Sequence, residues 1–280
     1  MKIRKKNIFQ STIFRIVAVV IILVLPINIM TLILSRMVLD KNQEQMTKDF
    51  QTALEWNMEN LQTTMTSASK RLISLSINDA EFISLAKSAN RENTSDNSKQ
   101  INHVAKTLKS LQSEYPWMDL MYFYFPQTDY LISAGYPGVS HESCRKQIRN
   151  AANSKEDITQ NWSVGEIDGT GIAFSLNSWN DADFGIIINL ERLLGRLNFG
   201  EDWEGKVVLF TNKDRTIFTE KGQEYFEEQQ MTLEEMEQSK RYQVFIAEGE
   251  KSDLVMVEIV DWERQMANLP FTITMLQVIP

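Results

Sequence analysis

The sequence predicts an α+β fold, in which one long N-terminal helix is followed by two units of short helices and antiparallel strands. Three observations lead to this prediction. They are an uncharged apolar run at residues 16–34, a helical stripe of apolar side chains over residues 37–75, and two successive groups of short strand-like segments separated by turn residues. The helix precedes every strand, so the rest of the chain is organised around it.

The apolar run reads IVAVVIILVLPINIMTLIL and has the length of a membrane span. At 1.5 Å per residue it covers about 28 Å, close to the hydrocarbon thickness of a bilayer. Pro26 is tolerated, because neighbouring groups in a spanning helix can satisfy the freed carbonyl. Basic residues precede the run (Lys2, Arg4, Lys5, Lys6 and Arg15), whereas the first acidic residue is Asp40. The positive-inside rule therefore places residues 1–15 in the cytoplasm and sends the chain after the span across the membrane.

A cleaved secretory signal peptide is the alternative interpretation of the same run. Such a signal has an apolar centre of about 7 to 15 residues, followed by small residues at the cleavage site. Here the run is longer, and residues 34–37, LSRM, offer no small pair. We therefore expect an uncleaved anchor at 16–34 in the cell membrane, with residues 37–280 extracytoplasmic.

The charge of the extracytoplasmic part is strongly acidic. Six of the 29 basic residues precede Met37 but none of the 37 acidic ones do, which leaves 23 basic against 37 acidic residues and a formal charge of −14. Nucleic acid and anionic lipid both require positive potential, so neither is expected as a partner of this part. Neutral and cationic ligands stay open.

Catalytic and metal-binding patterns are not found in the sequence. The only histidines, His103 and His141, lack a neighbouring motif, and no phosphate loop, metal-spaced cluster or nucleophile elbow is present. Cys144 is the single cysteine, so no intrachain disulfide can form, and we expect it to be a small structural residue on a helix. The segment is not expected to be an enzyme or to hold a metal or cofactor.

The stalk over residues 37–76 contains no proline or glycine. Its apolar residues recur at helical spacing, at positions 46, 50, 54, 58, 61, 65, 68, 72 and 75. The residues between them are polar, so one face is expected to be buried against its own domain, against a second copy in a homodimer, or against both.

Helices and strands are expected in the first unit, residues 77–199. The predicted helices are 78–89 with Asp79 as cap, 101–113, 142–152 and 190–197, and the predicted strands are 118–125, 130–134, 162–166, 171–177 and 184–189. On the first strand, Leu120, Tyr122 and Tyr124 share one face, because side chains alternate along a strand.

The second unit, residues 200–280, has a similar make-up. The predicted strands are 207–211, 216–219, 242–247, 254–261 and 271–278, and one acidic helix is predicted over 224–240.

Two αβ units that follow a long helix emerging from the membrane resemble the PAS-like double Cache domain of bacterial receptors. The pattern that carries the resemblance is WSVGEIDGTGIAFSLN at 162–177, followed by FGIIINLERLLGRL at 184–197. It consists of a tryptophan-started strand, a hairpin, and a glycine-led strand that ends in a cap for a Leu-rich helix. The resemblance implies a membrane-distal subdomain (77–199) and a membrane-proximal one (200–280). It does not extend to the amino-acid-binding signature, since residues 142–161 contain Arg145 and Arg149 but no Trp-Tyr pair.

The basic tail, the proline-containing span and the long helix together resemble sensor histidine kinases of Gram-positive bacteria. In that family a second span, a HAMP linker and a kinase follow the sensor. The resemblance therefore implies that this chain is a sensor segment cut before the second span.

Ligand-binding residues are expected among aromatic and charged side chains of the first unit. The candidates are Tyr122, Tyr124, Tyr130, Arg145, Arg149, Trp162 and Asp183. Aromatic rings offer stacking surface to neutral sugars, carboxylates accept hydrogen bonds from hydroxyls, and guanidinium groups donate them. The alternative is that the tyrosines are sheet packing with hydroxyls at the rim.

The sequence thus predicts the ligand-sensing region of a two-component sensor histidine kinase, which binds a small molecule, with sugars among the candidates, or a solute-binding protein. One alternative attaches the sensor to a chemotaxis receptor or a membrane-bound transcription regulator. Another is an anchored adhesion or assembly protein without a small ligand.

Overall fold

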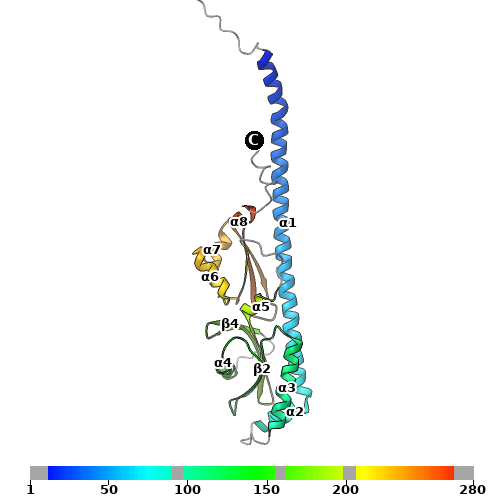
Figure 1. The fold of residues 1–280 in the computed structure, drawn as a ribbon, viewed down its shortest axis with the longest axis vertical. Helices are drawn as coiled ribbons and strands as arrows, with labels where there is room; N and C mark the ends of the chain where they lie inside the picture. Colours follow the sequence, from blue (N-terminus) through cyan, green and yellow to red (C-terminus); the bar gives the residue numbers. More distant parts are fainter. Residues whose placement is uncertain (1–11, 90–96, 155–161, 198–205, 268–280) are drawn as a thin grey trace, which may run out of the picture. The chain divides into compact units, whose positions relative to one another are not determined.

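A computed structural model describes residues 12–89, 97–154, 162–197 and 206–267 (Figure 1). The chain divides into two compact units, Met1–Phe50 with Gln265–Pro280, and Gln51–Arg264, and each is described by itself. The predicted strand at 271–278 lies outside the described residues.

The longest element is α1, which runs without a break over Thr12–Asn78 and contains Pro26. In the first unit its apolar side chains point into the surroundings, and Ile22 and Ile27 are 69% and 64% exposed. This part of the helix is long and apolar enough to cross a membrane. Exposure of these apolar side chains to water would be unfavourable, whereas a lipid environment would cover them.

The part of α1 in the second unit is buried along one stripe, as the sequence predicts. Leu61, Met65, Ala68 and Leu72 have no exposed surface, whereas Ser67 beside them is exposed. The stripe is therefore the contact face of the helix within this unit.

Two further helices follow α1. Helix α2 covers Ala80–Ala89 and α3 covers Ser98–Glu114. The Asp79 carboxylate accepts hydrogen bonds from the backbone N–H groups of Glu81 (3.0 Å) and Phe82 (3.2 Å). Asp79 thus caps α2, as the sequence predicts.

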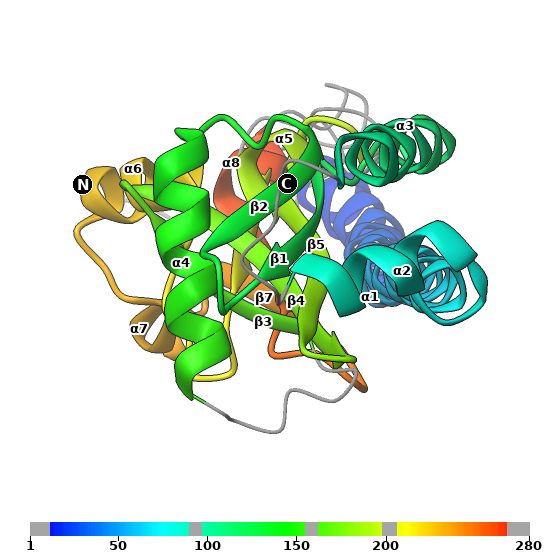
Figure 2. The same cartoon turned by 90° about the horizontal axis from the view of Figure 1, so that it is seen from below.

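The first sheet has five antiparallel strands in the order β2-β1-β5-β4-β3. Its elements are β1 (Leu120–Phe125), β2 (Tyr130–Gly135), α4 (His141–Ser154), β3 (Trp162–Ile167), β4 (Thr170–Trp179), β5 (Ala182–Asn189) and α5 (Leu190–Leu194). Figure 2 shows α4 over one face of this sheet and α2 and α3 over the other. All five strands predicted for this part of the chain are confirmed.

The second sheet has three antiparallel strands in the order β6-β8-β7. Its elements are β6 (Lys206–Thr211), α6 (Glu220–Gln229), α7 (Leu233–Gln238), β7 (Tyr242–Glu248), β8 (Val255–Asp261) and α8 (Trp262–Ala267). The core between the sheet and its helices contains Leu209, Leu233, Met236, Val257 and Ile259.

Two predictions for this sheet are wrong. Residues 216–219 form no strand. Their one β-bridge is an isolated one, between Ile217 and Thr211. The single helix predicted over 224–240 is two helices. Gln230 adopts a left-handed conformation (φ 52°) that ends α6, and Thr232 with Glu235 forms a capping box that starts α7.

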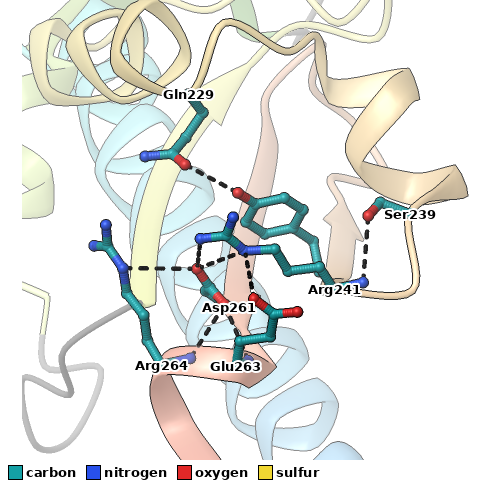
Figure 3. A network of polar contacts seen from close by, with 7 residues as sticks. Gln229, Ser239, Arg241, Asp261, Glu263 and Arg264 are labelled. Atoms are coloured by element: carbon teal, nitrogen blue, oxygen red, sulfur yellow. Dashed lines mark hydrogen bonds and ion pairs between the residues drawn. The ribbon is translucent and has the colours of Figure 1, made fainter. Parts of the chain in front are cut away.

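Asp261 at the end of β8 gathers several hydrogen bonds although it is only 2% exposed (Figure 3). Its Oδ2 accepts from Arg241 Nη2 (2.6 Å) and Nε (3.1 Å), and its Oδ1 accepts from the backbone N–H of Glu263 (3.0 Å). Burial alone would raise the pKa of Asp261, but these bonds outweigh it and hold the pKa below its usual range. The cluster fixes the end of β8 to the residue that precedes β7.

Candidate functional site

The face of the five-stranded sheet beneath α4 contains most of the candidate residues. Because side chains alternate along β1, Tyr122 and Tyr124 point to the same side as Leu120. All three belong to one buried cluster with Cys144 and Ile148 of α4. The predicted sharing of one face by these β1 residues is confirmed.

Tyr122 lies at the bottom of this cluster. It is 1% exposed, and its hydroxyl donates a hydrogen bond to the Ser175 carbonyl at 2.9 Å. Gly185 makes room for this bond, since a β-carbon there would lie 2.7 Å from the phenol oxygen. Burial raises the pKa of Tyr122 far above its usual range. Tyr122 therefore forms part of the apolar base beneath any ligand on this face.

Tyr124 lies closer to the polar edge of the same face. Its hydroxyl donates to Asp129 Oδ1 at 2.9 Å, and burial together with this carboxylate raises the pKa of Tyr124 to about 12. Arg149 of α4 donates to the other oxygen, Asp129 Oδ2, at 3.1 Å. Arg145 lies 3.9 Å from the same oxygen and pairs with Glu142 at 2.7 Å. The hairpin turn and α4 are thus joined through one carboxylate.

Arg145 has a further donor that is not used within the described residues. Its Nε is buried and has no hydrogen-bond partner there, although its terminal nitrogens are paired. Buried donors without a partner are rare in folded proteins, because losing water costs free energy that only a new bond returns. The Arg145 Nε–H is therefore an unsatisfied donor inside the cluster.

Asp183 is the second carboxylate on this face. It stands opposite Tyr124 in the β1–β5 register and opposite Ser178 in the β4–β5 register. Asp183 is 7% exposed, and its carboxylate accepts a hydrogen bond from the Ser178 hydroxyl. No ion pair of Asp183 is found among the described residues, and burial raises its pKa.

Tyr130 and Trp162 lie on the opposite face. Tyr130 stands opposite Phe125 and Trp162 opposite Ser175, and both of these partners alternate with residues that point toward α4. Tyr130 is 40% exposed, whereas Trp162 is 5% exposed. The structure therefore brings together five of the seven candidates: Tyr122, Tyr124, Arg145, Arg149 and Asp183.

Sequence reasoning missed the central residue of the cluster, Asp129. Asp129 lies in the turn between β1 and β2, where its φ is +47°. The available signal was an acidic residue in the turn of a hairpin whose first strand contains two tyrosines, followed by two arginines on one helix. Ser178, the hydrogen-bond donor to Asp183, was likewise not singled out.

The histidines and the cysteine of the described residues have structural surroundings. No group of three or more His, Cys, Asp or Glu side chains that could hold a metal ion occurs in residues 12–89, 97–154, 162–197 and 206–267. Cys144 is fully buried, and burial raises the pKa of its thiol to about 11, which disfavours the reactive thiolate. His141 pairs with the Ser133 hydroxyl at 2.6 Å and His103 with Asp79 at 3.0 Å.

Comparison with known proteins gives a likeness in structure only. No protein-family model matches the chain, and no curated protein sequence resembles it significantly. The extracellular domain of vpHK1S-Z8, described as a histidine kinase, has a TM-score of 0.52 and 11% identity, over 83% of this chain and 98% of that one.

Two further solved structures are less similar. The sensor domain of the V. cholerae histidine kinase DctB has a TM-score of 0.45 and 11% identity, over 79% of this chain and 98% of that one. The ligand-binding domain of the Pseudomonas aeruginosa amino acid chemoreceptor PctB, solved with L-Gln, has a TM-score of 0.41 and 11% identity, over 80% and 96%. The fold assignment rests on vpHK1S-Z8 and on the two antiparallel sheets that follow the long helix: the chain has the fold of double Cache sensor domains.

Proposed function

We propose that the chain is the extracytoplasmic ligand-sensing region of a two-component sensor histidine kinase, anchored by residues 16–34. In this proposal residues 1–15 are cytoplasmic, residues 77–199 form the membrane-distal subdomain and residues 200–280 the membrane-proximal one. The double Cache fold and an apolar helix long enough to span a bilayer support it. The kinase output is inferred from the resemblance of the N-terminal segment.

The ligand site of this proposal is the polar cluster beneath α4. The observation that carries it is Asp183, a nearly buried carboxylate without an ion pair among the described residues, opposite Tyr124 and its Asp129–Arg149 contact. The cluster therefore has hydrogen-bond acceptors and donors on one face of the sheet.

The charges of the cluster favour a neutral ligand. Asp129, Asp183 and Glu142, the partner of Arg145, carry three negative charges and Arg145 and Arg149 carry two positive ones, so the group is close to balance. Carboxylates accept hydrogen bonds from hydroxyls, and the guanidinium groups donate to hydroxyl oxygens. A neutral sugar, delivered free or on a solute-binding protein, is therefore the proposed ligand class.

The signal in this proposal travels along α1. Ligand binding must change the relative energies of two arrangements of the helices that enter the membrane. The buried stripe at Leu61, Ala68 and Leu72 is the contact through which the sheet can act on the helix. The resulting displacement of α1 would then reach the membrane span, residues 16–34, and the same span of the second copy in a homodimer.

A thermal-shift screen of the full chain in lipid nanodiscs tests the proposal. Sugars, amino acids, organic acids and peptides are each added at high concentration. A ligand at a hundred times its dissociation constant stabilises by about 2.7 kcal/mol, which is about 5 to 10 °C for a domain of this size.

Two variants of α4 give the screen its specificity. Arg149→Ala removes a contact of the cluster, whereas Lys146→Ala removes an exposed charge of the same helix that lies outside it. A sugar shift that is lost in Arg149→Ala and kept in Lys146→Ala supports the proposal. The absence of a thermal shift with all four classes, or a sugar shift that both variants keep, contradicts it.

A further inference from the structure

A cavity lies on the side of the five-stranded sheet that faces away from α4. Its volume is about 650 Å³, and it is lined by α1 residues between 55 and 70, by Trp162 at the start of β3, and by residues 246–252 around the β7–β8 turn. Volumes of about 300 to 1,000 Å³ are typical of small-molecule and cofactor sites. All of these residues belong to the unit Gln51–Arg264.

The wall of the cavity is held together by backbone hydrogen bonds. The Trp162 N–H donates to the Lys251 carbonyl at 3.3 Å, and the Asp253 N–H donates to the Trp162 carbonyl at 2.9 Å. The edge strand of the first sheet is thereby fixed to the turn that joins two strands of the second sheet. A molecule in the cavity would touch both sheets and α1.

The charges around the cavity are arranged unequally along α1. Glu55 and Glu59 line one end, and Lys70 lines the other, about 22 Å from Glu55 at helical rise. The β7–β8 turn adds Glu248, Glu250 and Lys251, so four carboxylates face two ammonium groups. All six residues are exposed at the rim, and the balance favours a ligand with net positive charge.

The middle of the cavity is apolar with two unused polar groups. Met58, Met65 and Trp162 are at most 5% exposed. Ser252 is also 5% exposed, and neither its Oγ nor the buried Nε2 of Gln62 has a hydrogen-bond partner among the described residues.

These two groups lie close together beside the α-carbon of Gly249. A β-carbon built on Gly249 would lie 2.0 Å from Ser252 Oγ and 2.2 Å from Gln62 Nε2. The amide donates and the hydroxyl both donates and accepts, so together they match the carbonyl and N–H of a peptide bond.

We propose that this cavity binds an extended, basic oligopeptide of about six residues. At about 3.3 Å per residue six residues cover about 20 Å, the reach from the carboxylates to Lys70. The ammonium and basic side chains of the amino-terminal half lie against Glu55, Glu59 and the carboxylates of the turn. The terminal carboxylate pairs with Lys70, and a central peptide group bonds to Gln62 and Ser252. This site is separate from the cluster beneath α4 and does not depend on the proposed sugar binding.

Affinity selection of a random hexapeptide library on the full chain in lipid nanodiscs provides the probe, with empty nanodiscs as the background. We expect enrichment of peptides with Lys or Arg in the amino-terminal half. The most enriched peptide is then synthesised and titrated calorimetrically against the chain, together with its carboxyl-amidated form and spermidine.

Matched variants locate the site. Glu59→Gln and Lys70→Ala should each weaken peptide binding about tenfold, since each removes one charge-assisted contact. Glu227→Gln on α6 and Lys109→Ala on α3 are exposed controls of the same charge and should change nothing. Amidation of the peptide should reproduce the loss seen with Lys70→Ala and add nothing to it.

Ser252→Ala separates a binding role from a structural one. Its hydroxyl makes no hydrogen bond within the described residues, so its removal should leave the melting temperature unchanged or slightly raised while peptide affinity falls several-fold. Failure to enrich any peptide over empty nanodiscs overturns the proposal. So does binding that Glu59→Gln and Lys70→Ala leave intact, binding that Arg149→Ala abolishes, or spermidine that binds as tightly as the peptide and displaces it.

Discussion

The Tyr124 hydroxyl donates a 2.9 Å hydrogen bond to Asp129 Oδ1, while Arg149 of α4 holds the other oxygen of the same carboxylate at 3.1 Å. A strand, a hairpin turn and a covering helix thereby meet at one side chain. This contact both stabilises the first sheet and shapes the polar edge of the proposed ligand site.

Loss of the Tyr124 hydroxyl should have a measurable cost. Tyr124→Phe removes one hydrogen bond to a charged acceptor, and we expect a loss of about 1.5 to 3 kcal/mol in unfolding free energy by urea denaturation. Tyr130→Phe is the control, because Tyr130 is 40% exposed and points to the other face. Equal midpoints for the two variants would mean that the Tyr124 contact contributes nothing.

Charge placed in the buried stripe of α1 should disrupt the packing of the second unit. Ala68 has no exposed surface and Ser67 is exposed, so Ala68→Glu should cost more than about 3 kcal/mol, whereas Ser67→Glu should stay within about 0.5 kcal/mol. Urea unfolding compares them. In the complete receptor, Leu61→Lys and Leu72→Lys should abolish the ligand response, and an intact response would refute the proposed route along α1.

Asp261 should contribute stability that disappears in acid. Its folded pKa is lowered by Arg241 and backbone donors despite burial, so its charged form is favoured in the folded state. The contribution is present above the unfolded pKa of about 3.9 and is lost as the pH falls through the folded value. Asp261→Asn should therefore be destabilising at pH 7 and converge with the parent chain as the pH falls below about 4. A difference that stays constant with pH would contradict this assignment.

Asp183 should behave in the opposite sense. Burial raises its folded pKa, so between the unfolded pKa of about 3.9 and the folded value the folded state binds more protons, and stability falls as the pH rises through this window. Asp183→Asn removes the cost of the buried charge and should be at least as stable as the parent chain at pH 7. The two should differ least in acid. Marked destabilisation by Asp183→Asn at pH 7 would show that an unrecognised partner holds the charge.

Local sequence signals located most elements of the fold. The helical stripe and the alternation Leu120-Tyr122-Tyr124 depend only on period, and the structure confirms both. The break between α6 and α7 was missed because Gln230 turns the chain without a glycine or proline. The Thr232–Glu235 capping box was present as a signal for the new helix.

The candidate site was predictable only in part. Separating Trp162 from Tyr122 required knowledge of the β1–β5 register, which sets Tyr122 opposite Gly185, and this pairing is decided by packing between distant segments. Asp129 is not identifiable as a site residue from the sequence, because the hairpin turn alone explains an aspartate at this position. Long-range geometry, rather than residue type, separates the two faces of the sheet.

Hydrogen–deuterium exchange of the full chain, with and without the sugar that gives the largest thermal shift, tests the central claim most directly. If the ligand binds beneath α4, added protection should be concentrated in β1, α4 and β5, and Arg149→Ala should remove it. Protection confined to β6, β7 and β8, or an exchange pattern unchanged by a compound that still binds, would contradict a ligand site on this face of the five-stranded sheet.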